Sequence, residues 1–185
     1  NPFVSYFKVF KDSFSSSAML EATFEDFQKK NLKSKFIADT KRSLNNLNKN
    51  GKIKYNIYDN LDKNKQKNIT QEILNQKISR SKDLKLSNIF DRNSQDFYLN
   101  FDNSNFKNGN LHISSLELNG EIISLHWGVV YKKTFYYLMP SLPKSEYMKY
   151  SPGRILLQYL IKWSIDHNIK KFDFTIGDEK YKKDW

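Results

Sequence analysis

Residues 151–154 have the types and spacing of an anion-binding helix start. Ser151 is a favoured N-cap residue, and Pro152 suits the first helical position. The free N–H groups and the dipole at such a start attract negative charge. Gly153 permits close approach of a pyrophosphate, and Arg154 adds a cation. The segment therefore indicates a phosphate site, although a Ser-Pro-Gly run also begins helices that bind no ligand.

A second group of polar residues lies in and after the last predicted strand, residues 171–176. Asp173 stands between Phe172 and Phe174, so its carboxylate is expected on the opposite face, where it is either functional or paired with a buried partner. Ligands of open α/β sheets bind outside the carboxyl ends of strands. The loop there carries four candidates for holding a substrate amine or carboxylate, with a solvated loop as the alternative: Asp178, Glu179, Tyr181 and Lys182.

His126 is the candidate proton acceptor, because imidazole titrates near neutrality. A two-residue turn at Asn119-Gly120 predicts a hairpin in which Ser115 faces Ser124 and Ile113 faces His126. In that register one face is small and polar, formed by Ser115, Ser124, His126 and Gly128. A core histidine bonded to a serine is the alternative. His112 and His167 are interpreted as structural.

Hydrophobic periodicity predicts the elements that position these residues. Helices are predicted at 26–50, 64–82, 94–106 and 152–168, and strands at 52–58, 111–118, 121–131, 134–138 and 171–176. Pro140 and Pro143 are expected to end the fourth of these strands. A hairpin, a further strand and a helical crossover favour an α/β or α+β fold, with a mixed, mostly antiparallel central sheet and helices on both faces. Residues 1–24 are predicted as an arm or linker and 25–185 as one domain.

Composition narrows the function classes. The net charge is +11, but only four of the 31 basic residues are arginine, which counts against a sequence-specific reader of nucleic acid. General attraction to phosphates, acidic glycans or a membrane surface stays open. The chain has no cysteine and no metal-ligand spacing, so no metal is expected. The longest apolar run, 122–131, is too short to cross a bilayer, and a cytoplasmic location is expected. The chain begins with Asn1, and we expect a piece of a longer protein.

The order of these pieces resembles the CelD-like (BioF-like) branch of the GNAT acetyltransferases, which is related to the FemAB aminoacyltransferases. The resemblance covers roughly residues 25–185. It rests on residues 35–44 with Asn50-Gly51, Gly120-Glu121, His126-Trp127-Gly128, Ser151-Pro152-Gly153-Arg154, Phe172-Asp173-Phe174 and Gly177-Asp178-Glu179 with Tyr181-Lys182. It implies a GNAT fold, acetyl- or acyl-CoA as donor, and an amine on a sugar, lipid or amino acid as acceptor, in cell-envelope or polysaccharide biosynthesis.

The resemblance also implies roles for individual residues. Ser151, Pro152, Gly153 and Arg154 would meet the CoA pyrophosphate, and Met139, Ser141 and Leu142 would run beside the pantetheine. His126, Asp173, Tyr181 and Lys182 would be catalytic, and Ser124, Asp178 and Glu179 would bind the acceptor. The glutamine/arginine-rich phosphate loop of typical GNAT domains is absent, and Ser141-Leu142-Pro143 lacks the expected acidic residue. The alternatives are a FemAB-like transferase with an aminoacyl-tRNA donor and a non-catalytic module that binds a glycan or a partner protein.

Overall fold

The computed structural model describes residues 15–58, 61–85, 90–101 and 109–185. Its six strands form one sheet in the order β1-β6-β5-β4-β3-β2. Their bounds are β1 Ser15–Met19, β2 Ile53–Ile57, β3 Gly109–Leu118, β4 Glu121–Tyr131, β5 Thr134–Ser141 and β6 Lys171–Ile176. Neighbours are antiparallel except β5 and β6, which are parallel. The predicted mixed, mostly antiparallel sheet is therefore confirmed.

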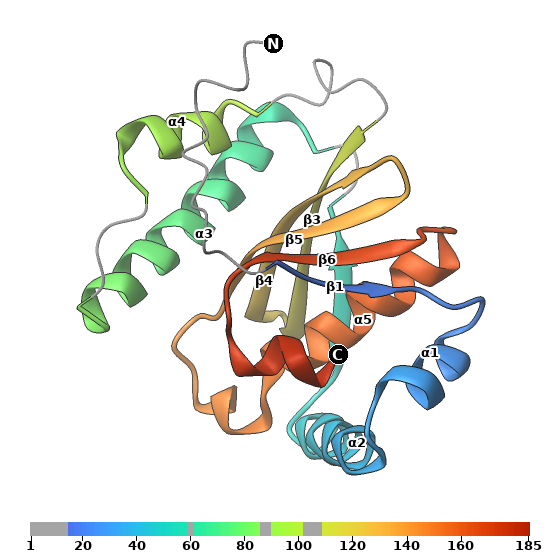
Figure 1. The fold of residues 1–185 in the computed structure, drawn as a ribbon. Helices are drawn as coiled ribbons and strands as arrows, with labels where there is room; N and C mark the ends of the chain where they lie inside the picture. Colours follow the sequence, from blue (N-terminus) through green and yellow to red (C-terminus); the bar gives the residue numbers. More distant parts are fainter. Residues whose placement is uncertain (1–14, 59–60, 86–89, 102–108) are drawn as a thin grey trace.

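Helices cover both faces of the sheet, as predicted. The α-helices of the described residues are α1 Phe24–Asn31, α2 Ser34–Asn48, α3 Lys63–Asp83, α4 Arg92–Leu99 and α5 Pro152–Asp166. Figure 1 shows α3 and α4 on one side of the sheet and α1, α2 and α5 on the other. Each side has its own buried cluster: Phe135, Leu156 and Phe172 lie on the α5 side, and Ile73, Leu125 and Trp127 lie on the α3 side. Both faces are apolar because both are covered.

Three predicted boundaries differ from the structure. The helix expected over 26–50 is two helices, because Leu32 and Lys33 are extended, with ψ of 139° at both, and Leu32 is buried. Residues 15–19 of the predicted arm form β1, while residues 1–14 lie outside the described residues. The helix expected at 94–106 begins at Arg92 and ends at Leu99, and of its predicted range residues 102–106 lie outside the described residues.

Pro140 does not end its strand. β5 continues to Ser141, and Pro140 pairs with His126 of β4. The ladder between β5 and β6 is confined to Tyr136 and the residues before it, so Pro140 has a strand neighbour on one side only. Proline is tolerated in a strand at such edge-like positions.

The predicted hairpin register is wrong beyond the turn. Leu118 does face Glu121, but a β-bulge at Leu116/Glu117 shifts the pairing, so that Leu116 faces Ser124 and Ser114 faces His126. The extra residue is Ile123 of β4, and it places Ser124 and His126 on the face of Leu116, opposite to Ser115. Ser115 consequently lies on the α3 side, where its Oγ is 2.9 Å from the hydroxyl of Tyr58.

Candidate functional site

The parallel ladder between β5 and β6 opens part-way along the two strands. Pairing runs only from Thr134 and Lys171 to Tyr136 and Asp173. Beyond this point β5 stays paired with β4 as far as Ser141, and β6 stays paired with β1 as far as Ile176. Each strand therefore follows its outer neighbour, and the two separate from each other in the middle of the sheet.

A cavity of about 360 Å³ lies where the strands separate. Its walls come from α3, β5 with the loop that follows it, the start of α5 and the C-terminal residues, with Phe36 of α2 at the rim. The lining residues are Phe36, Gln76, Lys77, Arg80, Tyr137, Pro140, Ser141, Leu142, Gly153, Arg154, Leu157, Glu179, Tyr181, Asp184 and Trp185. Because α3 and α5 cover opposite faces of the sheet, the cavity reaches both faces through the opening between β5 and β6.

The start of α5 forms one wall of this cavity. Ser151 stands at the N-cap position as predicted, but it is left-handed (φ 54°, ψ 54°) and its side chain makes no capping hydrogen bond. Its carbonyl accepts from the N–H groups of Arg154 and Ile155 at 3.0 and 3.3 Å. A Cβ at Gly153 would lie 3.1 Å from Leu142 Cδ2, so the helix start and the loop after β5 touch here. The Arg154 guanidinium lies 5.2 Å above the Phe36 ring.

Of the seven residues predicted to bind the donor, four line the cavity and three do not. Ser141, Leu142, Gly153 and Arg154 line the cavity. Of the other three, Pro152 is buried, Ser151 is half-buried, and Met139 packs in the core on the α3 side with 2% of its surface exposed. Ser124, predicted to bind the acceptor, is also buried, and its hydroxyl donates to the Ser141 carbonyl at 3.5 Å.

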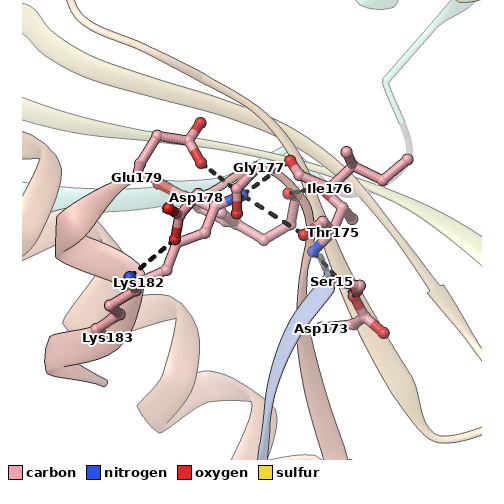
Figure 2. A network of polar contacts seen from close by, with 10 residues as sticks. Ser15, Asp173, Thr175, Ile176, Gly177, Asp178, Glu179, Lys182 and Lys183 are labelled. Atoms are coloured by element: carbon pink, nitrogen blue, oxygen red, sulfur yellow. Dashed lines mark hydrogen bonds and ion pairs between the residues drawn. The ribbon is translucent and has the colours of Figure 1, made fainter. Parts of the chain in front are cut away.

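Asp173 is satisfied by partners outside the cavity. Its carboxylate accepts from the Thr175 N–H at 2.8 Å and from the Ser15 hydroxyl at 3.3 Å (Figure 2). It also forms an ion pair with Lys171 at 3.0 Å. Of the two interpretations that the sequence left open for Asp173, the structure agrees with pairing. The carboxylate joins β1 to β6 at the point where β6 turns away from β5.

Lys182 holds the loop after β6 together. Its side chain is buried, and its ammonium donates to the carbonyl of Ile176 at 2.9 Å and to those of Gly177 and Thr175 at 3.4 and 3.5 Å (Figure 2). It also pairs with Glu179 at 2.9 Å. The ammonium is therefore directed into the loop carbonyls and not into the cavity, contrary to its predicted position facing the acceptor.

Glu179 and Tyr181 of the same loop do line the cavity, whereas Asp178 pairs with the exposed Lys183. Burial acts to raise the pKa of Glu179, but the hydrogen bond from Lys182 and the charges of Lys182 and Lys77 outweigh it and lower the pKa. Burial, and then the charge of Glu179, raises the pKa of Tyr181 to about 12. At neutral pH the cavity is therefore lined by a carboxylate, Glu179, and a protonated phenol, Tyr181, two residues apart in the chain.

The sequence reasoning missed the contribution of α3. Lys77 and Arg80 follow the buried Ile73 at intervals of four and seven residues, so they continue its stripe toward the cavity. Gln76 accepts from the Ser141 hydroxyl at 2.5 Å and joins this helix to β5. The helical spacing from Ile73 was a usable signal, but it required knowing which face of α3 meets the sheet.

His126 lies in an aromatic core and not in a polar pocket. It is fully buried, its ring stacks on Tyr137 at 4.6 Å, and it does not line the cavity. His112 packs against Phe135 and Trp163 at 5.0 and 4.4 Å. Within the described residues none of the four ring nitrogens has a hydrogen-bond partner. Burial lowers the pKa of His112 to about 3 and the pKa of His126 well below 6.5, so both are neutral. We assign neither a role as base.

The two buried, neutral histidines should make the stability of the fold sensitive to acid. The folded-state pKa of His112 is lower than its unfolded value of about 6.5, so the unfolded state binds more protons between pH 6.5 and 3. The free energy of unfolding should therefore fall as the pH drops below about 6.5, by about 3 kcal/mol at pH 4.5 from His112 alone. Urea denaturation at pH 7 and 4.5 measures it. His112→Phe should reduce the loss by that amount; an unchanged loss would show that His112 is protonated in the folded protein.

The described residues contain neither a metal-binding cluster nor a membrane-spanning helix. No group of three or more histidine, cysteine, aspartate or glutamate side chains there is arranged to hold a metal ion. None of the helices in that part of the chain combines the length and apolar character needed to cross a membrane.

Comparisons with known proteins agree with this geometry. Similar solved structures include FemX (TM-score 0.67, 10% identity, 96% of this chain and 60% of that one). A second is the C-terminal domain of a putative lysylphosphatidylglycerol synthetase from Agrobacterium fabrum, with a TM-score of 0.55, 11% identity, and coverage of 91% of this chain and 49% of that one. A third is L-PGS from Bacillus licheniformis, with a TM-score of 0.54, 12% identity, and coverage of 89% of this chain and 45% of that one. The chain thus spans about half the length of these proteins, and at such identities the likeness shows the fold. No curated protein matches the chain in sequence.

The family itself is shown by sequence. The model of the acetyltransferase (GNAT) domain matches residues 34–183, a range that holds α2 to β6, the opening between β5 and β6, and nearly all of the cavity lining. The chain therefore belongs to the GNAT acetyltransferase domain family.

Proposed function

We propose that this chain is an N-acyltransferase that moves an acetyl or longer acyl group from acyl-CoA to an amine. The observation that carries the proposal is the cavity at the opening of the β5–β6 ladder, bounded by the start of α5 and by Arg154. A helix start with a cation beside it suits a pyrophosphate, and an opened ladder offers backbone groups to an extended amide chain. The acceptor is an amine of cell-envelope or polysaccharide biosynthesis, in line with the CelD-like resemblance, and the reaction is cytoplasmic because acyl-CoA is made there.

The cavity residues suit this transfer. The donor pyrophosphate lies at Gly153 and Arg154, and its amide arm follows Ser141 and Leu142 toward Tyr137. The amine nitrogen attacks the thioester carbonyl carbon, the C–S bond breaks, and backbone N–H groups stabilise the oxyanion. Glu179 attracts the incoming ammonium, which loses one proton to solvent before the attack. The second proton leaves the nitrogen after the attack and passes to the departing thiolate, which is released as the CoA thiol. Tyr181 retains its own proton at neutral pH, because its pKa is raised to about 12, and hydrogen-bonds the departing sulfur.

Donor binding tests the proposal. Saturating acetyl-CoA should raise the melting temperature by about 5 °C, as expected for a ligand that binds only the folded state. Arg154→Met should weaken binding about tenfold, the usual effect of removing one charged hydrogen-bond donor. Lys162→Met, an exposed cation on the same helix, is the matched control and should bind like the wild type. No stabilisation by acetyl-CoA would refute the proposal.

An aminoacyl-tRNA donor is the second candidate. The net charge of +11 and a fold shared with FemX and with the C-terminal domain of a putative lysylphosphatidylglycerol synthetase favour it. Stabilisation by aminoacyl-tRNA but not by acetyl-CoA, with affinity that falls steeply with salt, would select this donor. Stabilisation by neither would indicate a non-catalytic binding module. In each case residues 25–185 are proposed to act as one domain, to whose sheet β1 of the predicted arm adds an edge strand.

A further inference from the structure

Two cations of α3 face the cavity without a carboxylate bound to them. Lys77 is half-buried and Arg80 is exposed at the same wall. Over the described ranges neither side chain has a hydrogen-bond or ion-pair partner. Two carboxylates line the cavity: Glu179 pairs with Lys182 at 2.9 Å, and Asp184 forms no ion pair with Lys77 or Arg80. Asp83, on the same helix, pairs with Lys144 at 3.0 Å. A half-buried ammonium usually has a counter-charge, so its absence here is informative.

The charges around Lys77 confirm that it is undercompensated. Burial lowers the pKa of Lys77 first, the charge of Arg80 lowers it further, and the attraction of Glu179 does not reverse the shift. A ligand anion placed between Lys77 and Arg80 would supply the missing negative charge and accept charged hydrogen bonds from both.

Lys77 and Arg80 lie on the opposite side of the sheet from the proposed donor site. Arg154 and Gly153 enter the cavity from the α5 face, whereas Lys77 and Arg80 enter it from the α3 face. A donor held at the start of α5 would reach the opening between β5 and β6 from one side. The opposite side, with Lys77 and Arg80, is then left for the acceptor.

We infer that the acceptor is an amine that carries an anionic group, a phosphate or a carboxylate, and that Lys77 and Arg80 bind this group while Glu179 faces the amine. That the bound molecule is the acceptor of a transfer rests on the proposed function. That Lys77 and Arg80 bind an anion does not. A neutral amine would leave the two cations uncompensated and so would bind less well.

Calorimetric titration of three short amines, without any donor, tests the site. The amines are O-phosphoethanolamine, β-alanine and ethanolamine, which differ in bearing a phosphate, a carboxylate or neither. At least one of the anionic amines should bind about tenfold more tightly than ethanolamine, and the stronger of the two identifies the anion. Arg80→Met and Lys77→Met should remove the preference. Lys67→Met, an exposed cation of the same helix away from the cavity, should keep it.

The outcomes separate this inference from the proposed function. Equal binding of all three amines, or a preference that survives Arg80→Met and Lys77→Met, overturns the anion site. A preference lost in Arg154→Met but not in Arg80→Met also overturns it, because the anion would then sit at the donor side. An anion preference that depends on Arg80, in a protein that acetyl-CoA does not stabilise, would uphold the site and refute the acyl-CoA-dependent transfer.

Discussion

Replacing Lys182 with methionine should lower the free energy of unfolding by about 2 kcal/mol, the order expected when a buried cation that donates to several carbonyls is lost. Its Nζ contacts the carbonyls of Thr175, Ile176 and Gly177 and the carboxylate of Glu179, so its removal leaves the loop after β6 without its central donor. The melting temperature should fall by roughly 4–8 °C for a chain of this size. Thermal unfolding followed by circular dichroism measures it.

The neighbouring lysine provides the matched control. Lys183 is 66% exposed and pairs with Asp178, which is 72% exposed, so Lys183→Met should change stability by less than about 0.5 kcal/mol. A Lys182→Met variant that melts like the wild type but has lost turnover would contradict the structural role. It would return Lys182 to the catalytic residues that the GNAT resemblance suggested.

Gly153→Val should lower kcat/KM roughly a hundredfold with little loss of stability, since small displacements of a reacting group cost that much. A Cβ added at residue 153 would lie 3.1 Å from Leu142 Cδ2, and the two methyl groups of valine would fill the space between the start of α5 and the loop after β5. Valine is a better helix former than glycine, so α5 itself should be unharmed. Thiol release from acetyl-CoA in the presence of an amine measures the rate, and the chain contributes no cysteine to the background.

A second-site change makes this prediction specific. Leu142→Ala removes the side chain that the valine would meet, so the double variant Gly153→Val with Leu142→Ala should recover part of the lost rate. Full activity in Gly153→Val alone would show that no donor passes between Gly153 and Leu142.

Local sequence signals predicted the elements well. The Asn119-Gly120 turn, the alternation of strands and helices, and the Ser151-Pro152 helix start all lie where the sequence placed them. The confirmed fold class follows from these local patterns and from the helical crossover through α5 that joins the parallel strands β5 and β6. The sequence identified four of the cavity residues because they lie next to the start of a helix or the end of a strand: Gly153, Arg154, Glu179 and Tyr181.

The wrong predictions have one physical origin: contacts between segments that are distant in the sequence cannot be inferred from the local sequence of either segment. The bulge at Leu116/Glu117 carries no glycine and shifts Ser115 away from His126. The direction of the Lys182 ammonium depends on three carbonyls exposed by the turn after β6. Lys77 and Arg80 became cavity residues only once α3 was docked on the sheet. Composition alone could not separate them from the other surface cations.

The early end of the β5–β6 ladder has a consequence for how this protein can change over evolution. Beyond Tyr136 and Asp173 the strands β5 and β6 no longer bond to each other through their backbones. The Tyr137 carbonyl accepts from the Thr175 hydroxyl, and the carbonyls at the end of β6 accept from Lys182, so only the remaining backbone groups of β5 could bind a ligand. Recognition through them tolerates substitution drift that would erase a side-chain motif. Substitution of side chains along β5 and β6 should therefore disturb donor binding less than a change that closes the opening between the two strands.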